Sequence, residues 1–162
     1  MNQDLTPKRW LDRLLHLHDT PRRTAAAFSL GVFFSFSPFI GLQILLSFAL
    51  AFLFRLNRLA VFIGLNANLP WFIAPWYAGT TLLAAYVLGV AVPAEFGSEI
   101  ARIFGLGILS RAFWSELWAL VRPFLVPYLV GPTIGAAVIG AATYPVTRAL
   151  LERRTLLRQR EQ

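Results

Sequence analysis

Polar and helix-disrupting residues interrupt two long apolar stretches of this chain, and they are its main candidates for chemistry. The first stretch covers residues 24–54 and is broken at 37–41; the second covers 59–92 and is broken at 66–70. Unpaired backbone groups are costly in hydrocarbon, so irregular segments persist at membrane depth only where protein buries them or where they line a cavity. The breaks therefore predict a membrane protein with broken helices, which form the ligand sites of many transporters.

Three amide side chains lie at or beside these breaks. Gln43 offers both donor and acceptor groups, so it could contact a lipid head group or a coupling ion. Equally, Gln43 could satisfy the carbonyl groups that Pro38 leaves without a donor. The same two interpretations apply to Asn66 and Asn68.

A short basic connection, Arg55-Leu56-Asn57-Arg58, separates the two stretches. It could bind a phosphate head group, although ordinary interfacial anchoring is the simpler interpretation. The candidate substrate-binding residues are therefore Pro38, Gly41, Gln43, Arg55, Asn57, Arg58, Asn66, Asn68 and Pro70.

Conventional catalysis finds little support in the sequence. The chain has no cysteine, which excludes disulfides, thiol catalysis and cysteine-based metal sites. Its two histidines, His16 and His18, would point to different faces of a helix. No zinc-protease, nucleophile-elbow or P-loop motif is present, and no acid lies in the apolar stretches. We expect a non-enzyme without a cofactor or metal.

Composition and charge favour a membrane protein. Of the 162 residues, 57% are hydrophobic and 14% are charged, whereas a soluble domain carries about 25% charged residues. The net charge of +7 could indicate nucleic-acid binding, but the arginines flank apolar spans and no nucleic-acid motif is visible. We expect membrane lipids as partners, and no nucleic acid.

The predicted domains are an N-terminal amphipathic interfacial helix (1–20), a membrane domain (21–150) and a basic cytoplasmic tail (151–162). A straight helix over 24–54 would be about 46 Å long, against a hydrocarbon core of about 30 Å. The length favours a re-entrant hairpin over a single kinked, tilted helix.

The later segments predict further helices. Residues 59–65 are too short to cross alone, whereas 71–92 can form one full span. Residues 94–122 suit an amphipathic interfacial helix or a pair of such helices, with a turn between the halves at Gly105 and Gly107. The last span, 123–147, is rich in small residues; Gly131, Gly135 and Gly140 permit close approach of another helix, and hence a homo-oligomer.

Arginine placement gives the topology. With a hairpin at 24–54 and spans at 71–92 and 123–147, every strongly basic segment faces the cytoplasm, as the positive-inside rule expects. The predicted fold is therefore all-α: a polytopic helical protein of the bacterial inner membrane, with both termini cytoplasmic, broken or re-entrant hairpins, and amphipathic interfacial helices.

Several of these residues also recur as an ordered set of motifs. The chain resembles the bacterial domain-of-unknown-function 2062 family over about residues 20–150, through Pro21-Arg22-Arg23, Gly31-Val32-Phe33, Pro38-x-x-Gly41-x-Gln43, Arg55-x-Asn57 and Asn68-x-Pro70. It departs from the family at Asn68-Leu69-Pro70, where an adjacent Asn-Pro is expected, so either Asn66 or Asn68 fills that role. Some members look fused to glycosyltransferase domains that use lipid-linked sugars, which implies an envelope-lipid context.

These observations lead to two functional hypotheses. The first is an integral inner-membrane protein that binds or translocates a lipid or lipid-linked molecule in envelope biogenesis. The alternative is a non-transporting membrane partner or scaffold that docks or regulates an envelope enzyme such as a glycosyltransferase. For that role the small-residue face of 131–142 would be the contact surface.

Overall fold

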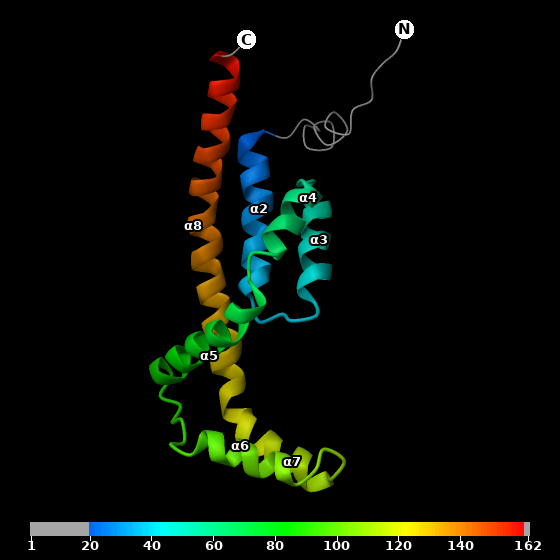
Figure 1. Cartoon of the computed structure of the whole chain (residues 1–162), viewed down its shortest axis with the longest axis vertical. Helices are drawn as coiled ribbons and strands as arrows, with labels where there is room; N and C mark the ends of the chain where they lie inside the picture. The colour runs from blue at the N-terminus through cyan, green and yellow to red at the C-terminus, as the bar shows by residue number, and fades with distance from the viewer. Residues whose placement is uncertain (1–19, 161–162) are drawn as a thin grey trace. The chain divides into compact units, whose positions relative to one another are not determined.

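The computed structural model describes residues 20–160, and this part of the chain contains helices and no strand. The all-α prediction is thus confirmed for these residues. The predicted N-terminal interfacial helix lies, apart from Thr20, outside them. The elements are α2 (Pro21–Phe36), α3 (Gln43–Leu53), α4 (Arg58–Leu65), α5 (Pro70–Val87), α6 (Phe96–Gly105), α7 (Arg111–Val121), the 3₁₀ turn η1 (Arg122–Phe124) and α8 (Leu125–Arg160) (Figure 1).

These elements form two compact units. Among the described residues, the first holds 20–68 and 136–160, so it contains α2, α3, α4 and the C-terminal part of α8. The second is Leu69–Gly135, which contains α5, α6, α7, η1 and the start of α8.

The first apolar stretch folds as a helical hairpin and not as one kinked helix. Thr20 caps α2 by accepting from the Arg23 amide, and Pro21 is the first residue of the helix. α2 ends at Phe36 because Ser37 is extended (φ −78°, ψ 155°), the conformation that a following proline favours. At the other end of the hairpin, the Arg23 guanidinium donates to the carbonyl oxygens of Phe54 and Arg55, at 3.2 and 2.9 Å, so α2 and α3 are antiparallel.

The turn of this hairpin requires a glycine. Gly41 has φ +89°, in the left-handed region that side chains disfavour. No atom of the described chain lies within 4 Å of the place where a Cβ on Gly41 would sit. Backbone conformation, rather than close packing, therefore accounts for the glycine at this position.

Small residues let α2 and α4 pack closely. A Cβ on Gly31 would strike the carbonyl oxygen of Val61 and lie 2.9 Å from the Gly64 Cα atom. Ala27 and Val61 are fully buried beside this crossing. Close backbone approach through small residues is the usual way for helices to pack in membranes.

The glycines of α8 also meet helices of the same chain. In the second unit, a Cβ on Gly131 would strike the carbonyl oxygen of Thr80, and one on Gly135 would lie 2.8 Å from the Trp76 ring. In the first unit, a Cβ on Gly140 would lie 3.1 Å from the Phe33 Cβ atom. Close approach at these glycines thus occurs within the chain, and a homo-oligomer through them would have to replace these contacts.

The segment after α5 forms the predicted amphipathic helix pair. α6 and α7 are joined by a turn in which Gly107 has φ +79°. Ile103 of α6 and Phe113 of α7 are buried, and the Phe104 and Phe113 rings meet edge-on with their centres 5.5 Å apart.

One helical stretch of the described residues, Arg111–Leu157, is long and apolar enough to cross a bilayer, and α4 with α5 makes a second if that broken pair is counted as one span. The predicted span at 123–147 is part of this stretch. α8 continues without a break past residue 150 to Arg160, so residues 151–160 of the predicted tail extend the same helix. α3, with 11 residues, is about 16 Å long and reaches only halfway across a hydrocarbon core of about 30 Å.

Candidate functional site

The two helix breaks meet in the first unit. The backbone N–H of Asn68 donates to the Ser35 hydroxyl at 2.9 Å, and the Asn68 side-chain amide donates to the Ser35 carbonyl at 3.1 Å, although the two residues are 33 positions apart. Ser35 and Ser37, two residues apart, are both buried. We call Ser35, Ser37 and Asn68 the break junction.

Ser37 takes the role that the sequence offered to Gln43. In a continuing helix the amide of residue 38 would bond to the carbonyl of Phe34, but Pro38 has no N–H. The Ser37 hydroxyl donates to that carbonyl at 2.9 Å instead. Gln43 begins α3, is half-buried, and its side chain has no hydrogen-bond partner among residues 20–160. A hydroxyl directly before the proline was the signal in the sequence for this role.

The break junction offers one unused acceptor. The Asn68 Oδ1 atom is buried and accepts no hydrogen bond within the described part of the chain. It lies beside the carboxyl-terminal end of α2, where the helix dipole is negative. An amide oxygen there can accept from a hydroxyl or ammonium group of a ligand.

The other residues of the second break have local roles. Asn66 is exposed at the C-cap of α4, where its side chain donates to the Phe62 carbonyl at 2.8 Å. Pro70 is the first residue of α5. Of the two asparagines, therefore, Asn68 is the one that joins the breaks.

The basic candidates lie at the opposite end of α2. Arg55 has a left-handed backbone (φ +52°), and the Arg58 guanidinium stacks on the Phe52 ring at 3.9 Å. The Asn57 side chain caps α4 by accepting from the amides of Leu59 and Ala60 at 3.0 and 3.1 Å, so its role here is structural.

Twelve residues along α2 separate Arg23, which binds the carbonyls after α3, from Ser35 at the break junction. That separation is about 18 Å at 1.5 Å per residue. The candidate residues thus form two sites rather than one. We call the second the basic end, made of Arg22, Arg23, Arg55 and Arg58.

The C-terminal part of α8 adds charge near the basic end. α8 runs beside α2 in the opposite direction (Figure 1), and its Gly140 lies next to Phe33 and Ser29. Eight residues further on, Arg148 comes level with the first turn of α2, by the equal rise of the two helices. Arg148 is ion-paired to Glu152 at 2.7 Å. Arg153 and Arg154 follow in the next turn.

With this geometry established, comparison with known proteins identifies the family. Residues 6–160 match the DUF2062 family, described as an uncharacterised protein conserved in bacteria. The chain belongs to this family. Comparisons with curated proteins and with solved structures returned no match. The DUF2062 match includes both helix breaks and the basic end.

Proposed function

We propose that this DUF2062 protein is an integral protein of the bacterial cytoplasmic membrane that binds or translocates a lipid or lipid-linked molecule. The observation that carries the proposal is the placement of the basic end and the break junction at opposite ends of α2. Large apolar side chains, among them Leu45, Leu53 and Phe62, are exposed on the flanking helices α3 and α4. Exposed apolar surface of this extent marks contact with a membrane or a protein.

The spacing of the two sites fits half a bilayer. Arginines favour the level of anionic head groups. Half of the hydrocarbon core is about 15 Å, close to the separation of about 18 Å along α2. With the basic end at the head groups, the break junction lies near the bilayer midplane, where transporters with broken helices place their sites.

In this arrangement α2 and α3 form a re-entrant hairpin that returns the chain to the cytoplasmic side. α4 and α5 cross the membrane together as one broken span, α8 crosses as a second, and both termini are cytoplasmic. The arginines of the basic end and those along the end of α8 then share one side.

The two sites have different chemistry. Guanidinium groups of the basic end suit a phosphate head group, by charge and by paired hydrogen bonds. Asn68 Oδ1, in contrast, is a neutral acceptor that suits a hydroxyl, such as that of a glycerol or sugar head group. A head group cannot occupy both at once, so binding requires the basic end and translocation requires the break junction as well.

The test is translocation of a fluorescent anionic phospholipid in vesicles that contain the purified protein. Dithionite added outside bleaches only outer-leaflet lipid, so loss of the protected fraction reports movement. Asn68→Ala should abolish movement, whereas Asn66→Ala should retain it, because Asn66 bonds only to the neighbouring Phe62 carbonyl. No movement with the parent protein would contradict translocation; equal loss in both variants would contradict the assignment of Asn68.

The alternative, a partner that docks or regulates an envelope enzyme, needs a surface other than the glycine face of α8. Gly131 and Gly135 pack against Thr80 and Trp76, so a Gly135→Leu substitution would first disturb the chain's own packing. Co-purification of an envelope enzyme, undiminished in Asn68→Ala and without lipid movement by the parent, would favour this alternative.

A further inference from the structure

We propose that the α6–α7 hairpin is an in-plane membrane anchor, with one face of α7 and the α6–α7 turn seated in the head-group region of the bilayer. The hairpin can occupy this position only if the chain is membrane-embedded, as proposed above. Lipid translocation is not required for it.

The hairpin is held together by its own contacts. Ser110 caps α7 by accepting from the Phe113 amide at 3.0 Å, and the Trp114 ring N–H donates to the Ile108 carbonyl at 3.0 Å across the turn. Together with the buried Ile103 and Phe113, these contacts fix how the two helices present their outer faces.

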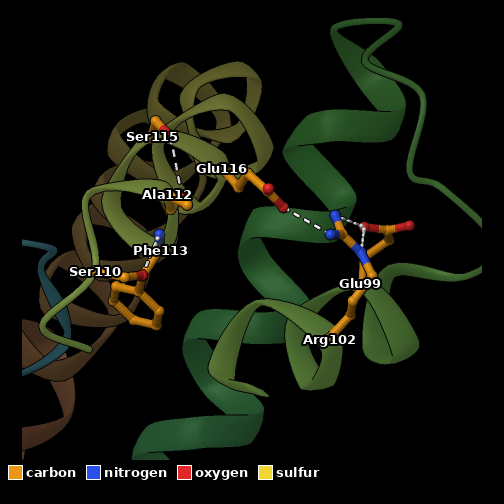
Figure 2. Close-up of polar contacts among 7 residues, drawn as sticks. All are labelled: Glu99, Arg102, Ser110, Ala112, Phe113, Ser115 and Glu116. Carbon is orange, nitrogen blue, oxygen red and sulfur yellow. Dashed lines mark hydrogen bonds and ion pairs between the residues drawn. The ribbon is translucent and has the colours of Figure 1, made fainter. Parts of the chain in front are cut away.

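An ion-paired triad joins α6 to α7. Arg102 lies between Glu99, at 2.8 Å, and Glu116, at 2.7 Å, as Figure 2 shows. The hydrogen bond to Glu99, then the one to Glu116, raises the pKa of Arg102. The charges of the triad are therefore paired within the hairpin, away from the outer face of α7.

The outer face of α7 combines tryptophans with arginines. Arg111, Trp114, Trp118 and Arg122 follow one another at helical spacing and so share a face. Trp114 and Trp118 are 61% and 57% exposed, and Leu109 in the adjoining turn is 97% exposed. Exposed tryptophans flanked by arginines are typical of helices at the lipid–water boundary.

Chain connectivity favours a bilayer as the occupant of this face. α7 leads through η1 directly into α8; both belong to the apolar stretch Arg111–Leu157, within which the predicted span starts at residue 123, after α7. α7 therefore stands at the end of a span, at the depth of the head groups. Arg111 and Arg122, which face the same way as the tryptophans, would meet lipid phosphates there.

The experiment uses the full chain in nanodiscs that contain anionic lipid. Because the parent has no cysteine, one fluorophore can be attached to each of four variants: Leu109→Cys, Trp118→Cys, Ser98→Cys on the exposed side of α6, and Leu83→Cys on α5. Leu83 is 65% exposed and serves as the control for membrane insertion. Quenching by lipids spin-labelled near the head group is compared with quenching by aqueous iodide.

Fluorophores at 109 and 118 should be quenched by the spin-labelled lipids about threefold more strongly than the one at 98, which iodide should reach. If 109 and 118 respond only to iodide while 83 responds to lipid, the anchor is wrong and the membrane location stands. If 109 and 118 respond to neither quencher, protein covers the face and the anchor is also wrong. Iodide quenching at 83 would overturn the membrane location itself.

Discussion

Substituting Asn68 by alanine separates function from stability, and the break junction allows the expected sizes to be worked out. The substitution removes the side-chain hydrogen bond to the Ser35 carbonyl, a loss of about 1 kcal/mol. It also removes the buried, unpartnered Oδ1 atom, whose desolvation costs about 1–3 kcal/mol. The two effects oppose each other, so Asn68→Ala should be close to neutral or slightly stabilising.

Ser35→Ala provides the contrast. It leaves the backbone N–H of Asn68, in a partly buried place, without its acceptor, at a cost of about 2 kcal/mol. For a chain of this length that lowers the melting temperature by about 4–8 °C, whereas Asn68→Ala should shift it by no more than about 3 °C.

The assay is thermal unfolding of the purified protein in detergent, paired with lipid movement measured on the same preparations. A protein that keeps a buried acceptor at the expense of stability is expected to use it. Asn68→Ala should therefore melt like the parent and move no lipid. If Asn68→Ala melts as early as Ser35→Ala, Asn68 serves only to hold the two breaks together, and its assignment as a ligand-binding residue fails.

Three further substitutions test the packing and the caps. Gly64→Ala would place a Cβ 2.9 Å from the Val32 backbone nitrogen, so overpacking should outweigh the gain in helix propensity and lower the melting temperature. The control Gly79→Ala has open space around it and should be neutral, or stabilise the chain by up to about 1 kcal/mol in the same thermal unfolding assay. Equal melting temperatures of the two variants would contradict the α2–α4 crossing. Asn57→Ala should lower the free energy of unfolding by about 1 kcal/mol because it removes the cap of α4, and Asn57→Asp, which keeps a capping oxygen, should retain the parent's stability. Thermal unfolding measures both. A loss of lipid binding at unchanged stability would mean instead that Asn57 contacts lipid. Arg55→Gly should stabilise the chain by up to about 1 kcal/mol, because glycine adopts a backbone φ of +52° without strain. The same substitution should weaken binding to anionic vesicles in a flotation assay, because it removes one positive charge from the basic end. Stronger binding would argue against the basic end as a phosphate site.

Local features of the fold were predictable from sequence. Pro38 marked the first break, and Asn66 together with Pro70 marked the second. A proline has no N–H and restricts the residue before it, so a helix usually ends ahead of a proline. Thr20 and Pro21 marked the start of α2, and Gly107 the turn between α6 and α7. These effects act over one helical turn and need no information from distant residues.

The candidate site was predicted only in part. Asn68 was named from its position in an apolar stretch, but its partner Ser35 lies 33 residues away inside α2, where a serine among small residues gives no distinct signal. Likewise, Glu99 and Arg102 were recognisable as neighbours in one helix, whereas the second carboxylate, Glu116, joins them only because α6 and α7 fold together.

The sequence by itself determined where the helices of this chain break and that its charges gather outside the apolar stretches. Tertiary structure decided which breaks meet. It placed Asn68 against Ser35 and the arginines of 55–58 at the opposite end of α2. It also packed the glycines of α8 against other helices of the same chain. The physical reason is that breaks and caps depend on neighbouring residues, whereas pairing between helices depends on close packing of small residues, and several alternative pairings share the same local pattern.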